Sequence, residues 1–459
     1  MSGAEHPITH FGGKLKVDQF IQQDKELLSK IIFMGAGYYA TNIVLPMITP
    51  NILANIISLP EDCPIATVGG PRVSPCIYAL VILNQPELTL PVKILLAESE
   101  TGTDREMRAE FGMLLQMTPT GGLVGLRFLP TSALGLGSGW QRPYYADHGA
   151  CESEIILGKG DLKVGGTLCL PSATHEQTEM PRLPCVVFLA GSGPCDRDST
   201  VQESKPFKDL ALGLARQGIA SVRFDKVTHT NPKTFLRRKD MTLTHEYVEH
   251  AVDAILIAQN HPSILPNGIF VLGHSLGAVV APMIAGMNAS IAGCIIMAGP
   301  AEPIYRCLIR QLRYIQSLDG PESLYLDKQI NEAQKQAELA DSDHLKLSTP
   351  AKQLPFGIGP SYWLDYRNFD PIGTTRSMKK PIIIMQGGRD YQVTVQDDYQ
   401  QWHAALHERD NVQFHLYEQL NHLFIAGDGI STPLEYSVPG NVNEQVISDL
   451  AKWILKVLW

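Results

Sequence analysis

Residues 268–282 read Gly-Ile-Phe-Val-Leu-Gly-His-Ser-Leu-Gly-Ala-Val-Val-Ala-Pro. An apolar run that favours a β-strand leads into Gly273-x-Ser275-x-Gly277, and a helix-forming run follows. Small neighbours permit the sharp, strained turn that lifts a serine hydroxyl clear of a sheet, an arrangement called a nucleophile elbow. The Gly-x-Ser-x-Gly pattern alone is weak evidence, but this strand–turn–helix context favours Ser275 as a nucleophile over a purely structural turn.

From about residue 151 onward the chain repeats one hydrophobicity pattern. Short apolar runs alternate with amphipathic ones, which is typical of a mostly parallel sheet covered by helices on both faces. We therefore expect an α/β protein with the α/β-hydrolase fold, in which eight strands carry helices from the third strand onward. The expected strands are 154–157, 167–170, 185–190, 220–224, 269–272, 292–297, 381–385 and 412–417, and the expected helices are 207–217, 244–260, 278–287, 395–406 and 443–457.

One interval interrupts this alternation of apolar and amphipathic runs. About eighty residues separate the strand that ends near Gly299 from the strand that begins at Pro381, and they contain charged helical patterns at 305–317 and 326–339. An insertion at this point would lie over the carboxyl ends of the strands, where open α/β sheets bind ligands. We predict a helical cap at about residues 301–370, in preference to a helical pair packed on the side of the sheet.

The length of 459 residues is too great for one ordinary core, so two domains are expected. Residues 1–140 follow a different pattern from the rest. Expected strands at 77–83, 92–97 and 123–129 flank an expected helix at 104–116, after a helical start at 17–30, and the Gly-rich stretch 134–140 could be a linker. We predict an N-terminal accessory α+β domain over 1–140 and a catalytic α/β-hydrolase domain over 141–459.

Composition narrows the class of protein. The chain is 44% hydrophobic and 19% charged, as globular proteins are, and its net charge of -9 argues against a nucleic-acid partner. The apolar stretch 31–59 is broken by prolines and diluted by polar residues, so it predicts buried helices rather than a membrane span. Residues 1–29 do not resemble a signal peptide, and the eight cysteines show no metal-type spacing. We expect a reduced, cytoplasmic location.

A serine hydroxyl needs a base that a carboxylate orients. In the α/β-hydrolase fold the three residues follow in the order Ser, acid, His, on loops after late strands. Asp390 follows the expected strand 381–385 in the run Gln-Gly-Gly-Arg-Asp, and His422 follows the expected strand 412–417. We predict that they complete a catalytic triad with Ser275. His274 is interpreted as the variable position of the elbow, and Asp397 and Asp398 are fallback acids expected on the solvated face of the next helix.

Two backbone N–H groups are needed to hold the oxyanion of a tetrahedral intermediate. Leu276, directly after the nucleophile, supplies one, and Ser192 is nominated for the other because the loop 189–198 is rich in small residues. This loop lacks the Gly-Lys-Ser/Thr of a phosphate-binding loop. No metal ligand set and no nicotinamide or flavin fingerprint is found, so no cofactor is expected. Five charged residues near the same strand ends are predicted to brace loops: Asp196, Arg197, Asp198, Asp225 and Lys226.

Seven motifs together are similar to those of a known family. They are Gly-Ser-Gly-Pro-Cys-Asp-Arg-Asp (191–198), Lys-Pro-Phe-Lys-Asp-Leu-Ala (205–211), Arg-Phe-Asp-Lys (223–226), Gly-His-Ser-Leu-Gly (273–277), Gln-Gly-Gly-Arg-Asp-Tyr-Gln-Val (386–393), Asn-His-Leu-Phe (421–424) and Ser-Thr-Pro (431–433). They resemble the EstD-type carboxylesterases, which are α/β hydrolases near the dienelactone-hydrolase branch, and the likeness runs from about Tyr145 to the C-terminus.

The resemblance implies esterase activity on short to medium acyl esters, with Ser275, Asp390 and His422 on the family's triad. The chain also departs from the family. Ala190 stands where many relatives have His, and Val227 stands where the family has Arg. Both changes alter loops around the acyl pocket, so the family's substrate preference does not transfer with the motifs.

Three alternatives to a carboxylesterase acting on a small-molecule ester remain open on the sequence alone. The same triad could serve an acyltransferase or a biosynthetic tailoring enzyme. A short-peptide peptidase would need an amine-binding carboxylate near the cap, for which Glu322 or Glu332 could be imagined. A non-catalytic binding protein that kept the fold is the third. The physiological substrate and the oligomeric state are not predicted.

Overall fold

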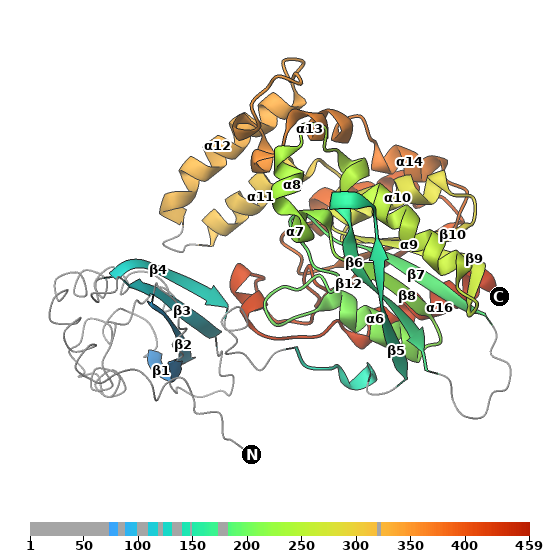
Figure 1. Cartoon of the computed structure of the whole chain (residues 1–459), viewed down its shortest axis with the longest axis horizontal. Helices are drawn as coiled ribbons and strands as arrows, with labels where there is room; N and C mark the ends of the chain where they lie inside the picture. Colours follow the sequence, from blue (N-terminus) through green and yellow to red (C-terminus); the bar gives the residue numbers. More distant parts are fainter. Residues whose placement is uncertain are drawn as a thin grey trace. The chain divides into compact units, whose positions relative to one another are not determined.

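The computed structural model describes residues 140–146, 149–172, 182–318 and 323–459, together with the backbone of four strands between residues 73 and 130. Figure 1 shows these elements along the chain. Internal contacts divide the chain into two compact units. The first comprises Met1–Trp140, Gln316–Tyr325 and Pro433–Pro439, and the second comprises Gln141–Ile315, Leu326–Thr432 and Gly440–Trp459. Two short segments therefore group with the first unit although the sequence pattern assigns them to residues 141–459.

The second unit is built on an eight-stranded sheet with the strand order β12-β11-β10-β9-β7-β8-β6-β5. Strand β6 pairs antiparallel with both β5 and β8, and every other neighbouring pair is parallel. This confirms the predicted α/β-hydrolase sheet. The strands are β5 (Ala150–Leu157), β6 (Val164–Pro171), β7 (Leu183–Leu189), β8 (Ala220–Phe224), β9 (Ile264–His274), β10 (Ile291–Met297), β11 (Ile382–Gly387) and β12 (Val412–Tyr417).

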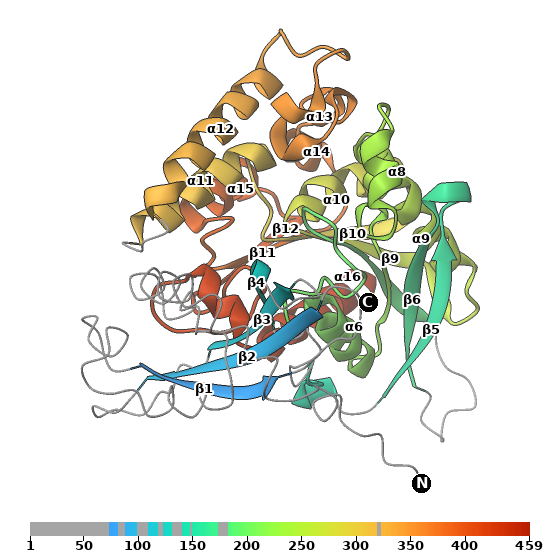
Figure 2. The same cartoon turned by 60° about the vertical axis from the view of Figure 1, so that its left-hand side comes forward.

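Helices cover both faces of this sheet, which is why the central strands read as continuous apolar runs. All residues of β7, β8 and β11 are buried. Helices α6 and α16 pack together on one face, while α9, α10 and α15 belong to the other, and Figure 2 shows α6 and α16 across the sheet from α10. Their bounds are α6 (Pro206–Arg216), α9 (Glu249–Asn260), α10 (Leu276–Met287), α15 (Gln400–Leu406) and α16 (Glu444–Leu458).

Two of the predicted helices begin with a turn of π-helix. The turn η5 (Thr244–Val248) precedes α9, and the turn η8 (Val395–Tyr399) precedes α15. Such turns occur often at functional sites, because the wider turn displaces a side chain from the regular helical register. Both turns carry buried carboxylates, Glu246 and Asp398, whose partners are described below.

The interval between β10 and β11 is helical, as predicted, and it holds α11 (Ile304–Ser317), α12 (Ser323–Asp341), α13 (Pro360–Tyr366) and α14 (Pro371–Ser377). Figure 1 shows α13 above the short helices α7 (Val227–Thr230) and α8 (Pro232–Arg237). Helix α11 reaches the loop that follows β11. Tyr314 stacks on Tyr391 with ring centroids 5.2 Å apart, and Gln311 Nε2 donates to the carbonyl of Gln392 over 3.1 Å. This contact at the carboxyl end of β11 supports the interpretation of the insertion as a cap.

The described part of the first unit contains a four-stranded antiparallel sheet in the order β1-β2-β3-β4. Its strands are β1 (Val73–Leu80), β2 (Leu88–Glu98), β3 (Ala109–Met117) and β4 (Leu123–Pro130). The predicted helix over 104–116 is wrong, since β3 occupies most of that range. Its Leu, Met, Glu and Gln residues favour a helix, but hydrogen bonding to strands on both sides overrides a weak propensity that Gly112 lowers further.

The predicted helix at 17–30 and the apolar stretch 31–59 lie outside the described residues, as does the linker 134–140 apart from Trp140. Within the part of the chain that is described, none of the helices combines the length and apolar character that crossing a bilayer would require.

Candidate active site

Ser275 occupies a strained turn between the end of β9 and the start of α10. Its backbone angles are φ 56° and ψ -122°, in a region that residues with a side chain rarely adopt and that costs on the order of 1–3 kcal/mol. Its N–H donates to the carbonyl of Met297 over 3.0 Å, which anchors the turn to β10. Backbone strain that the surrounding structure maintains is typical of functional positions.

The two glycines of the elbow are required by backbone crowding. A Cβ atom on Gly273 would lie 2.1 Å from the carbonyl oxygen of Gly277. A Cβ atom on Gly277 would lie 2.1 Å from the carbonyl oxygen of Leu189, at the end of β7. Both distances are far inside van der Waals contact, and the atoms that would clash are backbone atoms that cannot rotate away. The Gly-x-Ser-x-Gly spacing is therefore a steric requirement of this turn.

His422 and Asp390 form a buried pair. His422 Nδ1 donates to Asp390 Oδ2 over 2.7 Å, and each residue exposes only 5% of its surface. The other carboxylate oxygen accepts the backbone N–H groups of Gln392 and Val393 at 2.8 and 2.9 Å, and Gln386 Nε2 lies 3.2 Å from Oδ2. The proton on Nδ1 fixes the imidazole as the tautomer whose Nε2 carries a lone pair. That nitrogen is then able to accept a proton.

His274 connects the elbow to the loop that carries His422. Its Nε2 donates to the backbone carbonyl of His422 over 2.8 Å, and the two imidazole rings have centroids 4.6 Å apart. Burial lowers the pKa of His274 to about 3, with the neighbouring His422 as a further cause, so His274 is neutral near pH 7. The sequence pattern treats this position as variable and offers no signal for the contact, because the partner is a backbone carbonyl 148 residues away.

The hydroxyl of Ser275 has no hydrogen-bond partner among the described residues, and only 6% of the residue is exposed. Ser275 and His422 are therefore neighbours through His274 without a hydrogen bond between their side chains. Hydroxyl–imidazole bonds of unliganded enzymes are often long and tighten when substrate binds, so this geometry leaves the predicted pairing available.

The loop after β7 passes directly beside Ser275. A Cβ atom on Gly191 would lie 3.2 Å from Ser275 Cβ and 3.6 Å from Ser275 Oγ, so no larger residue fits there without displacement. Ser192, the nominated oxyanion donor, is exposed, and Leu276 is the first residue of α10. Both nominated N–H groups therefore belong to segments that adjoin the nucleophile.

Charged residues at the same strand ends brace this loop, as predicted for structural ion pairs. The backbone N–H and Nε of Arg197 donate to Asp225 Oδ1 over 2.8 and 3.2 Å, and Arg197 Nη2 donates to Asp225 Oδ2 over 2.9 Å. Asp198 accepts from Arg223 Nε at 2.8 Å and from Lys205 at 3.0 Å. None of these hydrogen bonds involves Ser275 or His422.

The fallback acids do not behave alike, and the prediction of a solvated face is wrong for Asp398. Asp397 is exposed, but Asp398 is fully buried because the π turn η8 directs it inward. Asp398 accepts the N–H groups of Ala301 and Thr394 at 2.9 and 2.8 Å and pairs with Arg310 of α11. Burial raises the pKa of Asp398 to about 6. Asp398 thus anchors the insertion, whereas Asp390 is the acid bonded to the histidine.

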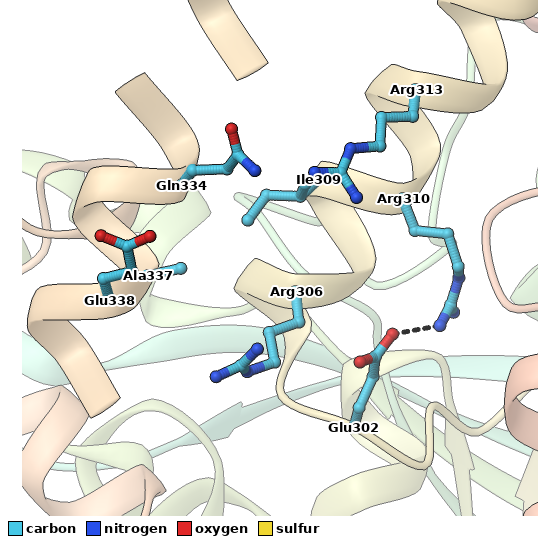
Figure 3. Close-up of a pocket in the computed structure, with 8 residues that line it drawn as sticks. All are labelled: Glu302, Arg306, Ile309, Arg310, Arg313, Gln334, Ala337 and Glu338. Carbon is cyan, nitrogen blue, oxygen red and sulfur yellow. Dashed lines mark hydrogen bonds and ion pairs between the residues drawn. The ribbon is translucent and has the colours of Figure 1, made fainter. Parts of the chain in front are cut away.

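A cavity of about 340 Å³ lies between α11 and α12, as Figure 3 shows. Its charged residues are largely neutralised within the insertion, since Arg310 pairs with Glu302 and Arg306 pairs with Asp341. The cavity contains none of the predicted site residues. It is lined by Glu302, Arg306, Ile309, Arg310, Arg313, Gln334, Ala337 and Glu338.

The carboxylates imagined for a peptidase gain no support. Glu332 is exposed on α12, where it accepts from Gln336, and Glu322 lies outside the described residues. Across the described ranges no three His, Cys, Asp or Glu side chains gather as metal ligands would.

Comparisons with known proteins identify the family of this chain. A model described as "Alpha/beta hydrolase family" matches residues 178–429, a range that contains Ser275, Asp390 and His422. Esterase EstD of Thermotoga maritima is 33% identical over 352 residues, covering 76% of this chain and 77% of the esterase. Among solved structures, Est1E from Butyrivibrio proteoclasticus covers 68% of this chain and 99% of its own, with 15% identity and a TM-score of 0.42. A Pyrococcus furiosus esterase covers 67% and 91%, with 16% identity and a TM-score of 0.39.

Proposed function

Since the chain belongs to the alpha/beta hydrolase family and is a hydrolase, we propose that it cleaves carboxylic esters through an acyl-enzyme intermediate. In this proposal Ser275 is the nucleophile, His422 is the general base and Asp390 orients His422. The substrate is a small-molecule ester. Similarity to Esterase EstD over most of both chains supports ester hydrolysis as the reaction class.

The observation that carries the proposal is the buried hydrogen bond of 2.7 Å between His422 Nδ1 and Asp390 Oδ2, on loops that adjoin the strained turn of Ser275. An imidazole held in this way has a free Nε2, and the carboxylate stabilises the imidazolium that forms when Nε2 takes a proton. The bond of His274 to the His422 carbonyl supports the approach of the imidazole to the elbow.

In the first half-reaction, Ser275 Oγ attacks the ester carbonyl carbon while His422 Nε2 takes the hydroxyl proton. The carbonyl oxygen becomes an oxyanion, for which the N–H groups of Leu276 and Ser192 are the proposed donors. The carbon–oxygen bond to the alcohol then breaks, and His422 returns its proton to the departing alkoxide. Ser275 is left as an acyl ester.

In the second half-reaction, water takes the place of the alcohol. His422 removes a proton from the water as its oxygen attacks the acyl carbon, and the same N–H groups hold the second oxyanion. Collapse of this intermediate releases the carboxylic acid and returns the proton to Ser275 Oγ. Asp390 holds the tautomer of His422 throughout.

The test compares Ser275→Ala with Ser221→Ala on nitrophenyl esters and with a fluorophosphonate probe. Ser221 is a matched control because it is a fully buried serine of β8 that the proposed reaction does not use. We expect Ser275→Ala to lower kcat by about 10⁶ and to abolish labelling, while Ser221→Ala keeps both. Unchanged hydrolysis by Ser275→Ala would refute the proposal, and a wild-type protein that neither hydrolyses esters nor takes the label would favour a binding protein instead.

A further inference from the structure

Lys226 is a buried lysine whose ammonium group is fully occupied. Its side chain exposes 1% of its surface, directly after β8. Its Nζ donates to the carbonyl oxygen of Gly191 at 2.7 Å and to the hydroxyl of Tyr247 at 2.8 Å, and it pairs with Glu246 at 2.8 Å. An ammonium group has three protons, and each of the three has an acceptor here. The lysine is therefore held in one orientation.

Gly191 is the point at which this buried group meets the proposed site. Its carbonyl accepts a second hydrogen bond from the Tyr247 hydroxyl at 2.9 Å, so both lone pairs of the oxygen are used on the buried side. The C=O of Gly191 and the N–H of Ser192 belong to one peptide unit, which is planar and trans because the described backbone contains no cis bond. In such a unit the two groups point in opposite directions.

We propose that Lys226 is a positioning residue, which fixes the Gly191–Ser192 peptide so that the Ser192 N–H faces the oxyanion beside Ser275. Rotation of this peptide by half a turn would aim a carbonyl oxygen at the developing negative charge. The bonds from Lys226 and Tyr247 to the Gly191 oxygen, with a weaker one from the Cys195 thiol at 3.8 Å, oppose that rotation. The inference rests on the proposed function, because it assigns a role within the same reaction.

The network also strengthens the Ser192 N–H as a donor. A hydrogen bond from a cation to an amide oxygen draws electron density from the amide nitrogen, and chains of hydrogen bonds polarise one another in this sense. Lys226 does this from a buried position, where water does not compete for the hydrogen bond. The effect is greatest when negative charge appears on the substrate oxygen, and so it acts on the transition state.

The partners of Lys226 hold it in place. Glu246 balances its charge and accepts a further hydrogen bond from Tyr362 of α13, in the insertion. Burial, with the adjacent Glu246 carboxylate, raises the pKa of Tyr247 well above its ordinary value, so its hydroxyl stays protonated as a donor to Gly191. Apolar residues of similar volume often replace a whole buried pair without loss of stability, whereas removal of one partner destabilises the fold because it leaves the other charge buried and uncompensated.

The experiment measures kcat and KM for nitrophenyl esters in Lys226→Met, Tyr247→Phe and Tyr305→Phe, with active sites counted by fluorophosphonate labelling taken to completion. Tyr247→Phe removes one hydroxyl from Gly191 and is nearly isosteric. Tyr305→Phe is the control, since Tyr305 is another buried tyrosine whose hydroxyl bonds a carboxylate, that of Asp341, away from Gly191. Inhibition by a trifluoromethyl ketone, whose serine adduct carries an oxyanion, is measured in parallel.

We expect Tyr247→Phe to lower kcat about tenfold and Lys226→Met to lower it about 10²-fold, with KM within about twofold, because loss of an oxyanion donor costs about 10²–10³. The inhibition constant of the ketone should rise by the same factors, and Tyr305→Phe should match the wild type. A purely structural role would lower the melting temperature without moving kcat per labelled site.

Wild-type kcat in folded Tyr247→Phe and Lys226→Met would overturn the inference while leaving the proposed function intact. If Lys226→Met does not fold, Tyr247→Phe decides alone. A wild-type protein without esterase activity would refute the proposed function and the inference together.

Discussion

The His274 ring holds the main chain of His422: its Nε2 donates to the His422 carbonyl oxygen over 2.8 Å, and neither residue exposes more than 7% of its surface. The residue before the proposed nucleophile thus anchors the loop of the proposed base. Phe207 and Phe424 contact the same ring edge-on, with centroids 6.4 Å away in each case. The imidazole is consequently fixed by packing as well as by its hydrogen bond.

Replacing His274 by Phe keeps a ring in this position but removes the donor. We expect kcat to fall by about 10- to 100-fold, because a catalytic group displaced by a fraction of an ångström loses rate of that order. Steady-state kinetics on a nitrophenyl ester gives the comparison, with His415→Phe on β12 as the control histidine. Equal kcat in the two variants would show that the carbonyl contact does not position His422.

The same histidine predicts a pH dependence of stability. The folded pKa of His274 is lowered to about 3 from an ordinary value of 6.5, so below pH 6.5 the unfolded chain binds a proton that the folded chain refuses. The contribution of His274 to the free energy of unfolding is fully present above pH 6.5. It is lost as the pH falls, and about 2 kcal/mol is lost at pH 5. Urea unfolding at pH 7 and pH 5 should show a larger acid loss in the wild type than in His274→Phe. A loss of equal size in both proteins would contradict the assignment.

Asp398 predicts a pH dependence of stability that is opposite in sign to that of His274. Its folded pKa is raised to about 6 from 3.8, so in this window the folded chain binds the proton more readily than the unfolded chain. The group therefore adds stability at low pH, and this contribution disappears as the pH rises through 6. Between pH 7 and pH 5 the wild type should gain about 1 kcal/mol relative to Asp398→Asn. Asp397→Asn is the matched control on the exposed neighbour and should follow the wild-type curve.

Two glycines of α10 should respond to alanine in opposite ways. At Gly277 the added methyl would meet the Leu189 carbonyl at 2.1 Å, so we expect Gly277→Ala to lose several kcal/mol of unfolding free energy, on the order of 3 or more, or not to fold. A Cβ atom on Gly286 would have no neighbour within 4 Å beyond the backbone of its own helix, and Gly286→Ala should gain up to about 1 kcal/mol because alanine favours a helix. Thermal unfolding distinguishes them, and tolerance of alanine at both positions would mean that the elbow relaxes away from β7.

The sheet could be predicted from the sequence because parallel strands covered on both faces leave apolar runs of strand length. Strands β8 (Ala220–Phe224) and β12 (Val412–Tyr417) have the bounds that the pattern predicts. Strand β3 could not be predicted in this way, since its residues favour a helix in isolation and only pairing with β2 and β4 makes them a strand.

Some residues of the candidate site could likewise be predicted from the sequence, and others could not. Ser275, Asp390 and His422 follow strand ends in a recognisable order, and the structure brings Asp390 and His422 into contact. The roles of Lys226 and His274 depend on backbone carbonyls distant in the chain, for which residue types at a given spacing give no sign. The prediction for Asp398 is wrong because a π turn shifts the register from which a solvated helical face is inferred.

The hydrogen-bonded chain from Tyr362 through Glu246 to Lys226 has a consequence for protein engineering. Exchanging the inserted helices for those of another hydrolase is an obvious route to a chimera with altered selectivity. Such a graft would strip Glu246 of a partner and disturb a carbonyl beside the nucleophile. A transplanted segment should therefore carry a tyrosine at the place of Tyr362, or turnover will suffer even where the new helices pack well.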